Sequence, residues 1–235
     1  MSLFKKIKQR LKYRSDKKAF INAGGSVKLD HPIYDDFYKQ AGTANGHYFH
    51  QDLLVAGFIN EAKPVRHMDV GSSIEGFVSH VASFRNIEII DIRPLKITAH
   101  PQITFTQGNL MALDSSLTEA CDSLSCLHAL EHFGLGRYGD PIDPLGHIKG
   151  FSNLHKMLKP GGTLYISFPI GDKGVHFNAH RVFDPKEILE WSANKFTLAR
   201  FDFVDDAGDL YKNIVIDQVP RSDYGCGIYT LKKLA

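Results

Sequence analysis

From residue 65 onward, short apolar runs alternate with segments whose apolar side chains recur at helical spacing. This alternation is typical of β-α-β units, in which each helix crosses back over a parallel sheet. The apolar runs predict strands at 65–70, 87–91, 103–106, 122–127, 162–168, 196–204 and 227–232. The helical spacing predicts helices at 74–84, 147–158 and 185–193. The second helix is stopped by Lys159-Pro160-Gly161-Gly162, a strong break.

Together these elements predict an α/β fold with a doubly wound, mostly parallel sheet of seven strands. After residue 195 the aromatic side chains alternate as they do in strands, with Phe201 and Phe203 as the clearest pair. We expect the last two strands to form an antiparallel hairpin at one edge, so that the C-terminal strand is antiparallel.

The chain before residue 65 has a different pattern. Residues 1–22 predict a basic amphipathic helix, with Phe4, Ile7 and Leu11 at helical spacing among lysines and arginines. A glycine-containing link follows it, and residues 23–235 are expected to form a single domain. Within that domain, residues 31–60 predict an N-terminal helical cap in two pieces, separated by a turn at 42–46.

Composition supports a globular protein, with 43% hydrophobic and 23% charged residues. The sequence contains no apolar run of about 18 residues, so no membrane-spanning helix is expected. The N-terminus lacks the apolar core and cleavage site of a secretory leader. Cys121, Cys126 and Cys226 show no paired spacing, which indicates reduced thiols and a cytoplasmic location.

Charge is distributed unevenly. Residues 1–18 contain eight Lys/Arg and one acid, whereas the rest of the chain contains 20 basic and 25 acidic residues. A mildly acidic body disfavours nucleic acid as a partner, because binding phosphates needs a basic face. The basic residues 1–14 instead favour peripheral contact with an anionic membrane, at the inner membrane surface.

The first predicted strand ends in a loop of small residues, Asp69-Val70-Gly71-Ser72-Ser73-Ile74-Glu75-Gly76. Small residues let the backbone turn sharply and let a ligand approach the amides at the start of the next helix. Asp91 lies 22 residues beyond Asp69, at the end of the second strand. An acid at this distance typically accepts hydrogen bonds from ribose hydroxyls, so the combination indicates an adenosine-containing ligand.

Two such ligands compete for this loop. Gly71, Ser73 and Gly76 occupy the Gly-x-Gly-x-x-Gly spacing of nicotinamide enzymes, but Ser73 stands where the second glycine makes room for a pyrophosphate. Asp69 also fits poorly beside a pyrophosphate and suits the ammonium group of a methionine. The loop therefore favours S-adenosylmethionine, with a nicotinamide-dependent reductase as an alternative.

These residues resemble the class I S-adenosylmethionine-dependent methyltransferases, whose first motif is acid-x-Gly-x-Gly-x-Gly. Glu75 departs from it by standing where the third glycine is common. The similarity continues in order through Asp91, Gly108-Asn109-Leu110, residues 122–132 and Leu158-Lys159-Pro160-Gly161-Gly162. Residues 127–140 are most similar to a poorly characterised group found among bacterial surface-polysaccharide genes. The resemblance implies S-adenosylmethionine as the cofactor, bound by Asp69, Gly71, Ser72, Ser73, Gly76, Asp91, Ile92, Asn109, Leu110 and Leu127.

Acceptor groups are expected on the loops after the fourth and fifth strands, because ligands of open α/β sheets bind at the strands' carboxyl ends. The candidates there are Arg137, Tyr138, His176, His180 and Arg181. Such polar groups suit a polyhydroxylated acceptor, which favours O-methylation of a sugar, as a nucleotide sugar or a surface-glycan component. The alternatives are a small phenolic or quinone-like acceptor and a non-catalytic S-adenosylmethionine-binding module.

His128, Glu131 and His132 follow the fourth strand at spacing i, i+3, i+4. If the chain becomes helical there, the three side chains share one face. We expect His128, the first residue past the strand, to be the general base and His132 to orient it or the acceptor. A divalent ion held by His128, Glu131 and His132 is an alternative hypothesis, as is a structural role in which the histidines bond the backbone.

Overall fold

The computed structural model describes residues 3–96 and 100–235. The chain divides into two compact units, Met1–Ala44 and Asn45–Ala235. Residues 23–44 were expected in the same domain as the sheet, and they belong to the first unit instead. Within the described residues, no helix is long and apolar enough to cross a membrane. The three cysteines are free and buried, as expected.

The first unit is built on α1 (Leu3–Asn22), which agrees with the predicted basic helix. The chain that follows packs back on one face of α1, where Tyr13 and Lys17 both hydrogen-bond to Asp30. Tyr13 and Lys17 are four residues apart and lie on one face of α1, whereas the apolar residues near the N-terminus, spaced three and four apart, share a different face. Three of them remain exposed, namely Phe4, Ile7 and Leu11.

The helical cap predicted at 31–60 is wrong in its first half. Only Asp36–Tyr38, a single 3-10 turn, and α2 (His47–Ala62) are helical there. Pro32 lacks an amide hydrogen and disfavours helical geometry in the residue before it, which keeps the segment after Asp30 extended. Gly46 adopts φ +93° immediately before α2 and so fixes where that helix begins.

The second unit contains one large sheet with the strand order β3-β2-β1-β4-β5-β10-β8-β9. Its strands are β1 (His67–Val70), β2 (Ile87–Asp91), β3 (Ile103–Gln107), β4 (Cys121–Leu127), β5 (Leu158–Gly171), β8 (Phe196–Val204), β9 (Leu210–Tyr211) and β10 (Tyr224–Lys233). The first five pair in parallel, and β10 lies antiparallel between β5 and β8. The prediction of a doubly wound sheet with an antiparallel C-terminal strand is confirmed, and β9 adds a short eighth strand.

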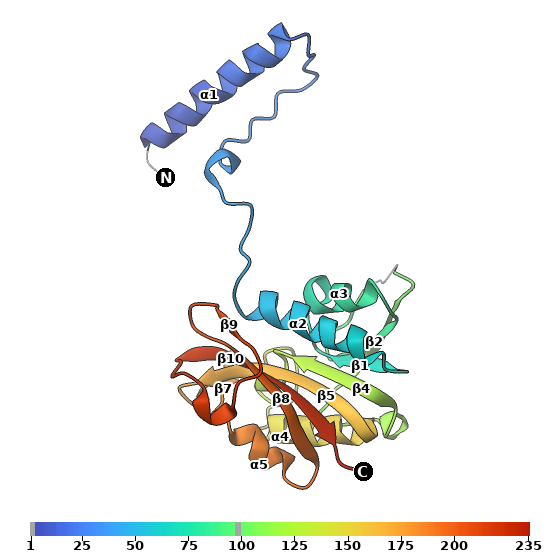
Figure 1. Ribbon diagram of the computed structural model, residues 1–235. Helices are drawn as coiled ribbons and strands as arrows, with labels where there is room; N and C mark the ends of the chain where they lie inside the picture. The colour runs from blue at the N-terminus through green and yellow to red at the C-terminus, as the bar shows by residue number, and fades with distance from the viewer. Residues whose placement is uncertain (1–2, 97–99) are drawn as a thin grey trace. The chain divides into compact units, whose positions relative to one another are not determined.

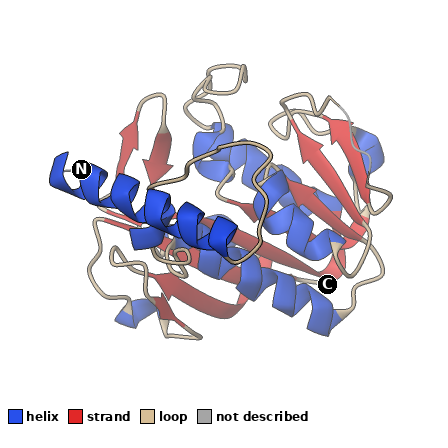
Figure 2. Ribbon diagram, turned by 90° about the horizontal axis from the view of Figure 1, so that it is seen from above, coloured by secondary structure: helices blue, strands red, loops and turns tan. Residues whose placement is uncertain are grey.

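Helices cover both faces of this sheet (Figures 1 and 2), with α2 and α3 (Ser79–Ala82) on one face and α4 (Gly146–Met157) and α5 (Glu187–Ser192) on the other. Alternate side chains of β5 enter the two cores. Leu164 and Ile166 belong to the cluster that contains Phe151 of α4, whereas Tyr165 belongs to the cluster that contains Ile59 of α2. A small separate hairpin is formed by β6 (Gly174–His176) and β7 (His180–Val182).

The helix predicted at 74–84 is interrupted. It starts as a π-type turn, Ile74–Val78, in which Gly76 has φ −94° and ψ −105°, outside helical geometry. A Cβ at Gly76 would lie 2.5 Å from Oδ2 of Asp52, a residue of α2. Gly76 therefore allows the close approach of α2 to the loop after β1.

Candidate active site

The candidate site lies where the order of the parallel strands reverses. From β1 the chain moves outward to β2 and β3, and then returns to place β4 on the other side of β1. The loops after β1 and β4 separate at this point, which makes it the usual ligand-binding crevice of an open α/β sheet. Two adjoining cavities are found there, of about 60 Å³ and about 720 Å³. Six residues line both cavities: Gly71, Asp91, Arg93, His128, His132 and Tyr138.

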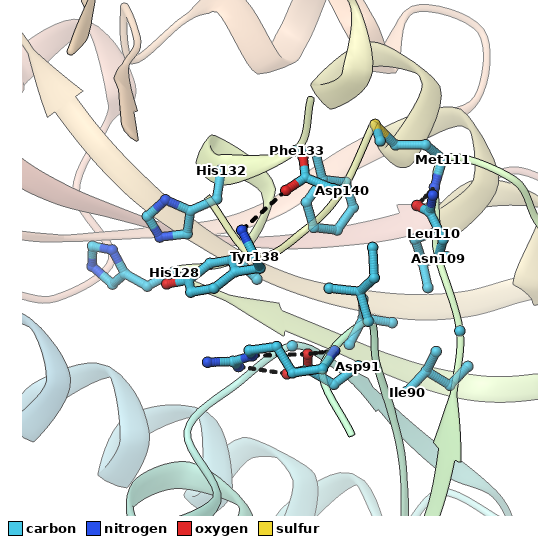
Figure 3. Close-up of a pocket in the computed structure, with 16 residues that line it drawn as sticks. Ile90, Asp91, Asn109, Leu110, Met111, His128, His132, Phe133, Tyr138 and Asp140 are labelled. Carbon is cyan, nitrogen blue, oxygen red and sulfur yellow. Dashed lines mark hydrogen bonds and ion pairs between the residues drawn. The ribbon is translucent and has the colours of Figure 1, made fainter. Parts of the chain in front are cut away.

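Asp91 ends β2, and its carboxylate lines the narrow cavity (Figure 3). Its Oδ1 accepts hydrogen bonds from the Arg93 main-chain nitrogen at 2.8 Å and from Nε at 3.0 Å, and its Oδ2 lies 2.5 Å from Nη2. The Arg93 guanidinium also lies over the ring of Tyr138, 4.5 Å from its centroid. A carboxylate has about four lone-pair directions and three are used by Arg93, so a ligand with two hydroxyls would share or replace one of these contacts.

Most of the expected cofactor residues line the two cavities. Gly71 has φ +72°, and a Cβ there would lie 2.9 Å from the Cβ of Ala129, so glycine is required for both reasons. Ile92, Asn109 and Leu110 line the narrow cavity. The wider cavity is lined by Ser72, Ser73 and Leu127.

Asp69 and Gly76 line neither cavity. The Asp69 carboxylate is fully buried behind the loop, where it accepts hydrogen bonds from the Ser72 nitrogen at 3.0 Å, Ser72 Oγ at 2.6 Å and Ser125 Oγ at 2.5 Å. Burial raises the pKa of Asp69 to about 6. The structure thus places Asp69 where it holds the loop in shape, not where it would meet an ammonium group.

The loop after β4 presents Arg137 and Tyr138 to the wider cavity, as expected. Its shape depends on Asp140, whose carboxylate accepts hydrogen bonds from the main-chain nitrogens of Gly134, Gly136 and Tyr138 at 2.7–3.2 Å. Both glycines have positive φ, of +79° and +73°, which lets the backbone wrap around the carboxylate.

The other three expected acceptor residues are placed differently from one another. His180 lines the wider cavity. His176 stacks on His180 at 5.0 Å but is exposed and lines neither cavity. Arg181 is buried, and its guanidinium donates to the main-chain carbonyls of Glu131, Phe133 and Pro144 at 2.7–3.3 Å. Placing His176 and Arg181 in the acceptor site was therefore wrong, and Arg181 instead holds the loop after β4 together.

Glu131 joins the two expected catalytic histidines. Its Oε1 lies 2.9 Å from Nδ1 of His128 and 3.7 Å from Nε2 of His132. The chain does not become α-helical here: His128 has φ +48°, and Leu130–His132 form a 3-10 turn. A non-glycine residue with positive φ is uncommon and is found preferentially at functional sites.

The alternative hypothesis of an ion held by His128, Glu131 and His132 does not match the arrangement of donor atoms. Among the described residues, the group whose donor atoms converge is His47, His128 and Cys226. Glu131 is hydrogen-bonded to Nδ1 of His128, and neither Glu131 nor His132 is part of the converging group.

The two histidines differ in electrostatic environment. Nδ1 of His132 donates to the Ala179 carbonyl at 2.6 Å, and burial lowers the pKa of His132. Its ring is therefore neutral at neutral pH and presents the lone pair on Nε2. Burial also acts to lower the pKa of His128, but Cys226 and the Glu131 carboxylate outweigh it and raise that pKa well above 6.5. At neutral pH His132 is therefore the one of the two that is unprotonated and able to accept a proton.

Sequence reasoning did not place Tyr48, Glu75 and Tyr224 in the site, yet all three line the wider cavity. Tyr48 comes from α2 and Tyr224 from β10, at opposite ends of the second unit's sequence. No local motif links such distant positions, so only the folded chain brings them together. Glu75 was visible, but only as a departure from the glycine motif.

A family model described as a Caenorhabditis protein of unknown function, DUF268, matches residues 105–190. No curated protein matches the chain. Among solved structures, the N-methyltransferase NodS from Bradyrhizobium japonicum WM9, in complex with S-adenosyl-L-homocysteine, is 13% identical with a TM-score of 0.54, over 80% of this chain and 88% of that one.

Two further structures are similar over almost the whole chain. The 1,6-didemethyltoxoflavin-N1-methyltransferase of Burkholderia thailandensis, with bound S-adenosylhomocysteine, is 15% identical with a TM-score of 0.56, over 95% of this chain and 88% of that one. The [4+2]-cyclase SpnF is 16% identical with a TM-score of 0.58, over 91% and 90%. At these identities the likeness shows the fold, which is the Rossmann-like fold of class I methyltransferases.

Proposed function

We propose that this protein is an S-adenosylmethionine-dependent methyltransferase. The observation that carries the proposal is the junction of the two cavities. The narrow one holds the Asp91 carboxylate, the wider one is lined by polar side chains, and both open onto the same histidines. A donor whose adenosine begins at the first cavity and whose methionine part extends along Ser72 and Ser73 into the second would face an acceptor bound there, which is the arrangement that group transfer needs.

The residues of the narrow cavity fit the cofactor. Asp91 would accept the ribose hydroxyls, and the apolar side chains of Ile92 and Leu110 would contact the adenine. The main-chain amides after Gly71 would face the carboxylate of the methionine part. When bound, the cofactor supplies a methyl group already activated on a sulfonium. The complexes of two similar methyltransferases with S-adenosylhomocysteine support this choice of ligand.

We propose a sugar hydroxyl as the acceptor, in a nucleotide sugar or a surface-glycan component. The wider cavity offers Arg137, His180 and Glu131 as hydrogen-bonding groups and the rings of Tyr138 and Tyr224 as flat apolar surfaces. Sugars present hydroxyls at their edges and C–H groups on their faces, so this mixture suits them. A small phenolic or quinone-like acceptor is the alternative, favoured by the same aromatic rings.

His132 is proposed as the general base in preference to His128. Its Nδ1 is held by the Ala179 carbonyl, and its ring lines both cavities, so Nε2 can take the proton that an acceptor hydroxyl loses. Glu131, 3.7 Å from Nε2, would stabilise the imidazolium that forms. His128 is assigned a different role below.

Calorimetry and a transfer assay test the proposal together. We expect S-adenosylhomocysteine to bind and NAD not to bind. Labelled S-adenosylmethionine should then transfer its methyl group to a member of a panel of nucleotide sugars, with simple phenols as the comparison set. Binding of NAD but not of S-adenosylhomocysteine would contradict the proposal. Cofactor binding without transfer to any acceptor would favour a binding module or a different reaction on the same fold, as the description of the similar SpnF as a [4+2]-cyclase illustrates.

We also propose that residues 1–14 bind an anionic membrane surface peripherally. The covered face of α1 is the one that packs on the chain around Asp30, and Phe4, Ile7 and Leu11 are left exposed among basic residues. Exposed apolar side chains surrounded by lysine and arginine are typical of helices that lie in the headgroup region. This would keep the enzyme at the inner surface of the membrane.

A further inference from the structure

A cluster of three donor side chains, two buried and one half-buried, lies beside the site. His47 is the first residue of α2, His128 follows β4, and Cys226 belongs to β10. One ligand atom from each lies within 4.8 Å of the other two. We propose that His47, His128 and Cys226 bind a divalent transition-metal ion of the zinc class.

The donor set determines the class of ion. Two imidazoles and one thiolate are borderline-soft ligands, which zinc prefers and magnesium or calcium does not. Three protein ligands with a fourth position left over are typical of catalytic rather than structural zinc sites. Zinc–nitrogen and zinc–sulfur bond lengths require donor atoms roughly 3.3–3.6 Å apart. The atoms found within 4.8 Å would reach this spacing by side-chain movements on the order of 1 Å.

His128 is already oriented as a ligand. Its Nδ1 is bonded to Glu131 Oε1 at 2.9 Å, and its Nε2 is buried without a hydrogen-bond partner among the described residues. Metal-binding histidines almost always donate their other ring nitrogen to a carboxylate or a main-chain carbonyl. A bound ion would give the buried Nε2 of His128 the partner that it lacks.

His47 lies beside His128. Its side chain is half-buried and comes from the first residue of α2. The ring lies 5.4 Å from that of His128, with an angle of 10° between their planes. Cys226 is fully buried and completes the cluster from β10, which is separated from β4 by β5.

The cluster adjoins the acceptor side of the site. His128 lines both cavities, and Tyr48 and Tyr224, which neighbour the cluster, line the wider one. An ion on His128 would therefore lie at the wall of the acceptor cavity and could polarise an acceptor oxygen there. This role rests on the proposed methyl transfer, whereas binding of the ion does not.

Metal analysis of the tag-free, full-length protein tests the inference. The chelator-treated protein is loaded with Zn²⁺ or Co²⁺ and dialysed, and the bound metal and the near-ultraviolet thiolate-to-cobalt absorption are measured. We expect about one ion per chain, because one such three-ligand group is found among the described residues. The ion and the absorption should be lost in Cys226→Ser and His47→Gln. They should be retained in Cys121→Ser, another buried cysteine, whose thiol bonds the Met157 carbonyl.

A variant that acts through the ligand orientation sharpens the test. Glu131→Gln keeps the three ligands but weakens the hold on Nδ1 of His128, so metal affinity should fall roughly 10–100-fold. Calorimetry with S-adenosylhomocysteine on the same samples separates the outcomes. Cofactor binding in Cys226→Ser with loss of the ion supports the metal site and shows that the variant is folded. Cofactor binding by a wild-type protein that takes up no metal overturns the inference and leaves the proposed function intact.

Discussion

The replacement Asp91→Ala tests the cofactor site most directly. Hydrogen bonds to a charged group contribute about 1.5–3 kcal/mol each, but both carboxylate oxygens of Asp91 already contact Arg93. Ribose hydroxyls must share or replace those contacts, so the net loss should be about 1–3 kcal/mol for the pair. That corresponds to a roughly 5–150-fold increase in the Kd for S-adenosylhomocysteine, measured by calorimetry.

Two further variants isolate the effect. Arg93→Ala removes the competing guanidinium and leaves the carboxylate, so it should raise the Kd less than Asp91→Ala does. Glu88→Ala alters the same strand but breaks only an ion pair with Arg66, and its Kd should match the wild type. If Asp91→Ala binds within twofold of the wild-type protein, the assignment of Asp91 to the ribose is wrong.

Three other outcomes are expected. Turnover should fall as the pH drops through the pKa of His132, which burial lowers below 6.5, because the base must be deprotonated. His132→Ala should abolish this acidic limb of the pH–rate profile. An unchanged profile in that variant would show that His132 is not the base. Arg181→Ala leaves buried main-chain carbonyls without a donor, so the free energy of unfolding should fall by about 2–3 kcal/mol. Thermal denaturation should then show a Tm lower by roughly 4–12 °C. Replacing Phe4, Ile7 and Leu11 with serine should lower sedimentation with anionic vesicles at least about tenfold while cofactor affinity is unchanged, and equal sedimentation would contradict the membrane role.

The periodic part of the fold was predictable because local and tertiary preferences agree there. Strand β2 was predicted at the residues where it occurs, since Ile87, Ile89 and Ile90 are buried β-branched residues in a short segment that ends at Asp91. The segment at 31–46 was mispredicted for the opposite reason. Its structure depends on contacts of Asp30 with α1 and on Pro32, and these override a helical pattern of apolar residues.

The site was predictable where motif position alone decides what a residue lines. Gly71 and Asp91 line the cavities because Gly71 directly follows β1, at the point where the sheet order reverses, and Asp91 ends the adjacent strand β2 at the same edge of the sheet. Asp69 and Arg181 carry equally suggestive side chains, but each is buried against partners that the sequence does not reveal. A charged residue near a motif therefore indicates a ligand contact only when no neighbour in the fold satisfies it first.

The two histidines that share Glu131 have different roles, because their neighbours in the fold differ. Each has its Nδ1 engaged, His128 by the Glu131 carboxylate and His132 by the Ala179 carbonyl, so each presents Nε2. Both rings line the two cavities. Nε2 of His128 is buried, in a ring that lies beside His47 and Cys226, whereas the side chain of His132 is the more exposed of the two, at 11% against 4%. One imidazole is therefore placed to hold an ion and the other to accept a proton. A carboxylate between them serves both, because it orients the first ring and stabilises a positive charge on the second.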